Sequence, residues 1–252
     1  MAMSFDQIRA ASAQHFEITR QDAQDSSETT PPELTPFIAD FAQSLGTGEA
    51  EFLPVVDDPY GLYGWCSDGV REKVRRDGGH CVFGWTIWEW PKVMLTAEFH
   101  CVWEDAEGRL LDITPKPMGE TRILFVPDRS YPGDFNFDHR PLNRRKRLYV
   151  ETDPSEEVAR AIAQLAGGKR QYEERRAQKA GMNLDAWLLS KMPPDPFAEV
   201  IDQLIATCDA FDKHFDSLGT AGTVAVDEKF QKLGLRRLSL QEELKRQLQR
   251  MG

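Results

Sequence analysis

The chain has 252 residues, 40% of them hydrophobic, so it can bury a substantial core in one large domain or two small ones. Its formal net charge of −10 argues against general binding to nucleic acids, which favour a basic surface. No apolar run reaches the roughly 20 residues that a transmembrane helix needs. Residues 1–20 lack the apolar centre of a secretory signal, and the four cysteines show neither metal-type nor disulfide-type spacing. We therefore expect reduced thiols, a cytoplasmic location, no membrane partner, and neither a metal nor a cofactor.

Residues 1–46 are predicted to be a peripheral N-terminal segment. Residues 4–13 favour a short helix, whereas residues 21–33 have little to bury and indicate a mobile linker. Thr35 followed by Pro36 is typical of a helix start, with an N-cap before proline at the first position. The apolar face that follows predicts a packing helix.

Residues 47–150 are predicted to form an α+β core. Residues 66–77 favour a partly exposed helix, preceded by a short strand and by a loop in which glycines alternate with aromatic residues. Stretches rich in β-branched and aromatic residues then predict an antiparallel meander, with a hairpin turn at 105–108. The strands of this meander are expected at 81–90, 93–103, 109–114 and 121–126.

Residues 130–147 are predicted to be a long loop with a basic cluster, which stands out in an acidic chain. Such a cluster can bind an anionic substrate, a phosphate or RNA. It can equally be a solvated loop or contact acidic helices, and the sequence leaves both interpretations open. The candidate anion-binding residues are Arg140, Arg144, Arg145 and Arg147.

Residues 151–252 are predicted to be a helical region. A cap-plus-proline start at 153–154 opens one long helix, and a second at 195–196 opens a helix whose apolar residues repeat every 3.6 positions. Ser239 and Glu242 match a capping box, which predicts the start of the last helix. That helix carries leucines in one narrow line, which either dock on the neighbouring helices or join chains into an oligomer.

The residues with the clearest chemical potential occur in the order Cys66, His100 and Asp112. Cys66 lies at a predicted helix start, where free backbone N–H groups and the helix dipole favour a thiolate, the nucleophilic form. The N–H of Cys66 can also donate to an oxyanion. Because a lone cysteine is more often a small buried hydrophobe, the interpretation depends on its partners.

His100 lies in a predicted strand, with Glu98 on the same face and Phe99 and Cys101 on the other. We expect the second pair to face the core and the first to face a cleft. Asp112 follows on the next strand and can orient His100 if directly opposite residues have numbers that sum to 212. This register requires a turn of three or five residues.

The arrangement resembles the transglutaminase-like core of papain-fold cysteine enzymes, in a branch of uncharacterised bacterial proteins. The family pattern is roughly Gly-x-Cys, a helix, a Gly turn, His-x-Trp and Asp-Pro-Thr. Here Trp comes one position later, and Asp-Ile-Thr-Pro replaces Asp-Pro-Thr. The resemblance implies a papain-like core in which Cys66 is the nucleophile, His100 the general base and acid, and Asp112 the orienting residue. It is carried by Gly64-Trp65-Cys66, Gly78-Gly79, His100-Cys101-Val102-Trp103 and Asp112-Ile113-Thr114-Pro115.

Supporting roles are less specific. Tyr63 and Trp65 are candidates for an oxyanion side chain, and Glu98 either supports His100 or is solvated. A metal site that combines Cys66 with neighbouring His–Cys pairs is the less favoured alternative, because adjacent strand residues point to opposite faces and each pair supplies one ligand.

We therefore expect a cysteine-dependent hydrolase or acyltransferase that acts on an amide bond in a protein or peptide-like substrate. The alternative is a catalytically inactive binding or adaptor protein of the same fold. It would use the helical region and the basic loop to hold a partner.

Overall fold

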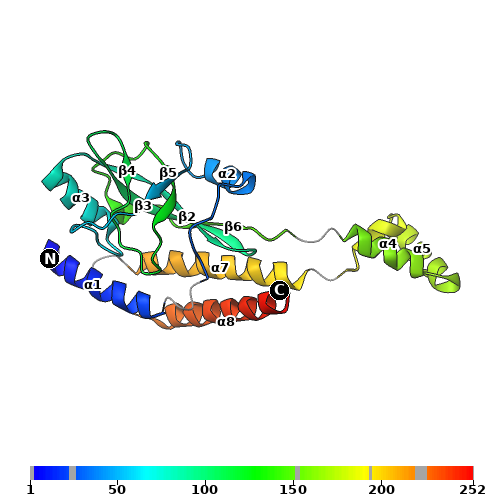
Figure 1. The fold of residues 1–252 in the computed structure, drawn as a ribbon. Coiled ribbons are helices and arrows are strands. Elements are labelled where there is room, and N and C mark those ends of the chain that lie inside the picture. Colours follow the sequence, from blue (N-terminus) through cyan, green and yellow to red (C-terminus); the bar gives the residue numbers. More distant parts are fainter. Residues whose placement is uncertain (1–2, 23–26, 151–153, 193–194, 219–225, 252) are drawn as a thin grey trace.

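A computed structural model describes residues 3–22, 27–150, 154–192, 195–218 and 226–251. Across these residues the chain is α+β, with eight helices and an open antiparallel sheet of six strands (Figure 1). The helices are α1 (Phe5–Asp22), α2 (Pro36–Gln43), α3 (Cys66–Asp77), α4 (Ser155–Gln164), α5 (Gly167–Lys179), α6 (Leu184–Leu189), α7 (Pro196–Ser217) and α8 (Glu228–Met251). The strands are β1 (Glu51–Pro54), β2 (His80–Trp90), β3 (Met94–Glu104), β4 (Leu110–Leu111), β5 (Arg122–Pro127) and β6 (Arg144–Arg147).

The long β2–β3 hairpin forms the centre of the sheet. It pairs from His80 opposite Glu104 to Trp90 opposite Met94, as expected for stretches rich in β-branched and aromatic residues. The strand order is β1-β5-β2-β3-β4, and β6 pairs with another part of β3. The predicted third strand is shorter than expected, because the chain leaves β3 after Leu111.

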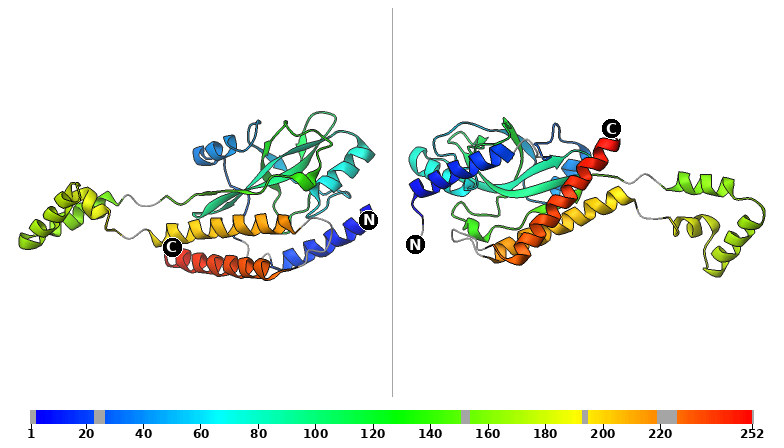
Figure 2. Two further views of the ribbon diagram at one scale, coloured as in Figure 1. Left: turned by 180° about the vertical axis from the view of Figure 1, so that it is seen from behind. Right: turned by 90° about the horizontal axis from the view of Figure 1, so that it is seen from below.

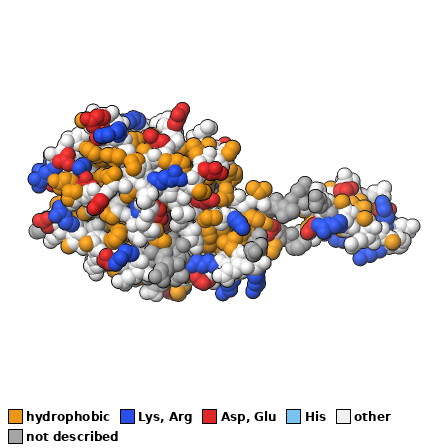
Figure 3. Space-filling view, viewed as in Figure 1, with side chains coloured by type: hydrophobic (Ala, Val, Ile, Leu, Met, Phe, Trp, Pro, Cys, Tyr) orange, Lys and Arg blue, Asp and Glu red, His pale blue; other side chains and the backbone are white. Residues whose placement is uncertain are grey.

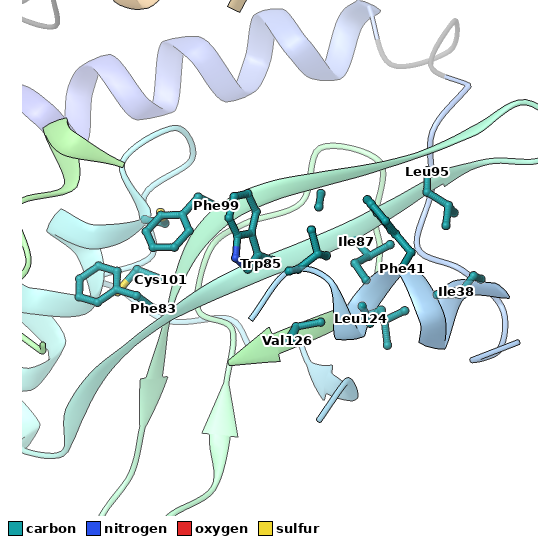
Figure 4. Close-up of a cluster of buried hydrophobic side chains, with 14 of the residues drawn as sticks. Ile38, Phe41, Phe83, Trp85, Ile87, Leu95, Phe99, Cys101, Leu124 and Val126 are labelled. Atoms are coloured by element: carbon teal, nitrogen blue, oxygen red, sulfur yellow. The ribbon is translucent and has the colours of Figure 1, made fainter. Parts of the chain in front are cut away.

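The main core lies between one face of this hairpin and helices α2 and α3. Phe99 and Cys101 point into it, which confirms the predicted alternation along β3. Figure 4 shows Phe83 beside these two residues at one end of the cluster and Ile38 of α2 at the other. At the far end of α3, the indole N–H of Trp103 donates to the carbonyl of Gly78 at 2.9 Å. The helix that begins at Cys66 is thus fixed to the sheet at both ends.

A second core joins the tip of the hairpin to α7 and α8, which run side by side beneath the sheet (Figures 1 and 2). Leu240 and Leu244 are buried there, so the leucine line of α8 docks within the chain. The predicted capping box is wrong: α8 begins at Glu228, and Ser239 lies inside it. The start of α7 is confirmed, because the Asp195 side chain accepts two N–H groups of the first turn.

Helices α4, α5 and α6 pack on one another and stand off the main body (Figures 2 and 3). The sequence predicts one long helix here, but the structure has a break between α4 and α5. Leu165 and Ala166 are extended, and Gly167 has a φ of 53°, a conformation that glycine adopts readily. The expected capping residue, Asp153, lies outside the described residues.

The N-terminal segment has a longer helix and more contacts with the sheet than the sequence predicts. α1 extends well beyond the predicted residues 4–13. Within the expected mobile linker, of which residues 23–26 are not described, Thr29 pairs with Glu89 of β2. The hydroxyl of Thr30 donates to the Arg122 carbonyl at 2.9 Å. The segment that leads to α2 is therefore tied to the sheet.

The expected basic loop contains strand β6, which links the sheet to α7. Arg145 has a nearly buried side chain, 2.6 Å from a carboxylate oxygen of Asp209 and 2.7 Å from one of Asp212. Arg147 pairs with Asp202 on the same helix at 3.2 Å. These ion pairs connect β6 to α7, so part of the expected polar loop is an ordered strand. No helix within the described ranges is both long and apolar enough to cross a lipid bilayer.

Replacing Arg145 by alanine should lower the free energy of unfolding by about 3 kcal/mol, because it leaves two carboxylates without their buried cation. Arg129→Ala is the matched control, since its exposed pair with Glu104 is worth about 1 kcal/mol or less. Urea denaturation of both variants checks this. Equal losses would show that β6 is not held to α7 through Arg145.

Candidate active site

Cys66 is the first residue of α3 and packs in the main core. The preceding loop lies close against the first turn of the helix and against the chain after Asp112. A Cβ on Gly69 would meet the Tyr60 carbonyl at 2.5 Å, and one on Gly61 would meet the Ile113 carbonyl at 2.1 Å. Both glycines are required by close backbone approach. One glycine of the loop and one glycine of the helix therefore allow the close packing that positions the thiol.

His100 lies in the middle of β3, opposite Gly84 of β2. On the other edge of β3, β6 pairs only as far as Ala97 and β4 begins only at Trp103. Within the described ranges, residues 98–102 therefore have no strand neighbour on that edge. His100 itself is only 7% exposed, and Asp112 and Cys66 both contact its ring.

Asp112 accepts a hydrogen bond from Nε2 of His100 at 3.1 Å, but not through the predicted register. Trp103 pairs with Leu111, so opposite residues sum to 214 instead of 212, and Asp112 is not directly across from His100. The chain turns away from β3 at this point. The N–H of Asp112 donates to the Pro54 carbonyl and its own carbonyl accepts from Val56, so β1 holds the aspartate in place.

The carboxylate of Asp112 is fully buried, with 0% exposure. Its Oδ1 accepts the backbone N–H of Thr114 at 2.9 Å in addition to His100. Its Oδ2 lies 2.6 Å from Nζ of Lys116, whose side chain is itself only 7% exposed. Sequence reasoning missed Lys116, because no spacing rule connects a lysine after Thr-Pro to the aspartate before it.

The charges of this cluster stabilise one another. Burial lowers the pKa of His100, but the Asp112 carboxylate and the Cys66 thiolate, which both hydrogen-bond to the ring, outweigh it and raise that pKa to about 10. Burial likewise raises the pKa of Asp112, yet His100 and Lys116 hold it well below its usual range. Since Nε2 faces Asp112, Nδ1 is left for the thiol. At neutral pH the site therefore contains a His100 imidazolium beside an ionised Asp112.

Only Cys66 among the four cysteines combines a helix start with a histidine. Burial raises the pKa of the Cys101 thiol well above its ordinary value. Its hydrogen bond with Cys81 lowers the pKa of Cys81, which has no histidine among its partners there. Burial also raises the pKa of Cys208 to about 11. These features favour Cys66 as the nucleophile.

The side chains of the predicted supporting residues contact His15 and Trp88. The rings of Tyr63 and Trp65 pack against His15 of α1, with centroids 4.8 and 6.1 Å from the imidazole. Glu98 is exposed and accepts the indole N–H of Trp88 at 3.2 Å. Through these contacts α1 covers the loop before Cys66. The contribution of α1 depends on contacts far apart in sequence.

Two arginines of the basic cluster also have local partners. The guanidinium of Arg140 lies 5.4 Å from the Phe137 ring centroid. Arg144 donates to the Ser44 carbonyl at 2.7 Å and lies 6.0 Å from the Trp85 ring. With Arg145 paired to α7, these side chains form packing contacts between elements. An anion-binding role remains a prediction.

A hollow of about 270 Å³ lies between α1 and the loop before Cys66. Neither Cys66 nor His100 nor Asp112 is among the residues that line it. The lining residues are Arg9, Ser12, Ala13, Phe16, Glu17, Gly61, Leu62, Tyr63 and Pro115.

No family model, no curated protein and no solved structure matches this chain. Within the described ranges, no group of three or more His, Cys, Asp or Glu side chains is arranged to hold a metal ion.

The raised pKa of His100 predicts a pH-dependent stability. The folded-state pKa, about 10, lies above the unfolded value of about 6.5. Hence the contribution of His100 is fully present below about pH 6.5 and is lost as the pH rises toward 10. The slope for one proton is at most about 1.4 kcal/mol per pH unit.

The measurement compares urea unfolding of Cys66→Ser with that of Cys66→Ser/His100→Gln between pH 6 and 10. The serine background removes the titration of the thiol, and it also lowers the upper end of the window because one anionic partner of His100 is gone. The stability difference between the two proteins should shrink as the pH rises. A difference that stays constant would contradict the charged state assigned to His100.

Proposed function

We propose that this protein is a cysteine-dependent hydrolase or acyltransferase that acts on an amide bond, built on a papain-like, transglutaminase-like core. The observation that supports it is the hydrogen-bonded series Cys66, His100, Asp112 at the start of a helix. Nucleophile, proton carrier and orienting carboxylate are in contact in the order that acyl transfer through a thiol needs.

In the first half of the reaction, the Cys66 thiolate attacks the carbonyl carbon of the amide. The N–H of Cys66 is in the first turn of α3, where backbone donors have no partner inside the helix, and it donates to the developing oxyanion. The His100 imidazolium then gives its proton to the leaving nitrogen. The C–N bond breaks, an amine departs and a thioester remains on Cys66.

In the second half, neutral His100 takes a proton from water or from an acceptor amine, which attacks the thioester. The C–S bond breaks and the thiolate–imidazolium pair is restored. Water yields a carboxylic acid, and an amine yields a new amide. Asp112 remains ionised throughout and keeps the ring oriented between thiol and substrate.

A binding or adaptor protein of the same fold is the second candidate. The observation in its favour is that Cys66 and His100 are each only 7% exposed, so a substrate has little access to them in this conformation. The α4–α6 unit, which stands off the body, would then be a surface for a partner (Figure 3).

Alkylation by iodoacetamide, followed at each cysteine by peptide mass spectrometry from pH 5 to 9, distinguishes the two. The enzyme proposal expects Cys66 to react at least tenfold faster than half-buried Cys81 at pH 6, because an imidazolium partner stabilises the thiolate. His100→Ala should remove this advantage.

Cys81→Ala is the control, and it should leave the Cys66 rate unchanged. A Cys66 that reacts no faster than Cys81, with or without His100, would favour the adaptor.

A further inference from the structure

Lys116 is a nearly buried cation in direct contact with the orienting aspartate. Lysine is almost never buried unless it is paired. Here its Nζ lies 2.6 Å from Oδ2 of Asp112, and its side chain is only 7% exposed. Nζ also lies 5.7 Å from the ring centroid of Trp88. The apolar stem and the ammonium are thus both held in place.

Lys116 and His100 use different oxygens of the same carboxylate. Oδ1 accepts from His100 and from the Thr114 N–H, while Oδ2 faces Lys116. With both oxygens engaged, Asp112 cannot rotate without breaking a charged contact. The ring of His100 is consequently held at the angle that presents its other nitrogen to Cys66.

Lys116 also balances the charge of the site. Asp112 faces His100 and Lys116, and His100 faces Asp112 and Cys66. Trp88, whose ring lies near Lys116, donates its indole N–H to the exposed carboxylate of Glu98. The carboxylate of Asp112 therefore lies between two cations, the imidazolium of His100 and the ammonium of Lys116. Without Lys116, the buried carboxylate would act on His100 alone, and the imidazolium would keep its proton more tightly.

We propose that Lys116 is a positioning residue that locks Asp112 and shares its charge, so that His100 can release its proton to the leaving amine. The role in turnover depends on the proposed function, whereas the coupling between Lys116 and His100 does not. An ion pair that served stability alone would need no contact with the carboxylate that orients the histidine.

The test replaces Lys116 by methionine, which keeps the apolar stem without the charge, and by arginine, which keeps the charge. Lys73→Met is the matched control, because Lys73 forms a similar pair with Asp58 at 2.8 Å outside the cluster. The variants are made in the Cys66→Ser protein, so the thiol does not contribute. The His100 ring is titrated by nitrogen-15 NMR.

Lys116→Met should raise the titration midpoint of His100 by about one pH unit. Lys116→Arg and Lys73→Met should leave it within a few tenths of the parent value. Lys116→Gln is a second neutral variant, in case methionine disturbs folding, and should shift the midpoint in the same direction. An unchanged or lowered midpoint in both neutral variants, even with a lower Tm, would overturn the proposal.

Turnover is tested separately, with the thiol restored. Lys116→Met should slow the breakdown of an activated anilide at least tenfold in kcat, with KM little changed, and Lys116→Arg should recover most of the loss. If the parent protein cleaves no anilide while the NMR shift is present, the proposed function fails but the coupling stands. If cleavage occurs and the neutral variants leave both kcat and the titration unchanged, the role of Lys116 fails alone.

Discussion

The buried carboxylate of Asp112 is the constraint on which the site depends. An ionised group with no exposure is tolerated only when its charge and its lone pairs are satisfied. Here the ring of His100 and the Thr114 N–H donate to Oδ1, and the ammonium of Lys116 forms an ion pair with Oδ2. These contacts explain why the chain leaves β3 after β4 and hydrogen-bonds to Pro54 and Val56 of the β1 region instead. The local path of the backbone thus satisfies a charge and at the same time creates the gap beside His100.

The rest of the fold places the Cys66 thiol near the buried cluster of Asp112 and His100. Close backbone contacts at Gly61 and Gly69 allow the loop before Cys66 to pack between α3 and the chain after Asp112. The core formed by α2, α3 and one face of the β2–β3 hairpin then fixes the start of α3 against the middle of β3. Arg145 has a corresponding part at the other end of the hairpin, where its ion pairs hold β6 to α7. The two paired charges thus lie on the β3 side of the sheet, where β4 and β6 pair with different parts of that strand.

Local features of the sequence were sufficient for the elements that position the site. The starts of α2 and α7 follow from Thr35-Pro36 and Asp195-Pro196, because a cap and a fixed φ act within one turn. Alternation along β3 correctly separated Phe99 and Cys101 from His100. Features that depend on distant partners were not accessible. The register at Leu111 and strand β6 follow from charges or backbone groups far away in the sequence. Lys116 is only four residues from Asp112, but no regular helix or strand spacing connects the two. The start of α8 was placed too late, because a capping-box pattern also occurs inside a helix.

In the proposed reaction Cys66 forms a covalent acyl intermediate with the help of His100. The most direct measurement is acid quenching of the protein during reaction with an activated acyl ester, followed by peptide mass spectrometry. We expect one acyl group per chain as a thioester on Cys66, formed within the first turnover and strongly reduced in His100→Ala. An acyl group on Cys81 or on lysines only, or equal labelling with and without His100, would contradict it.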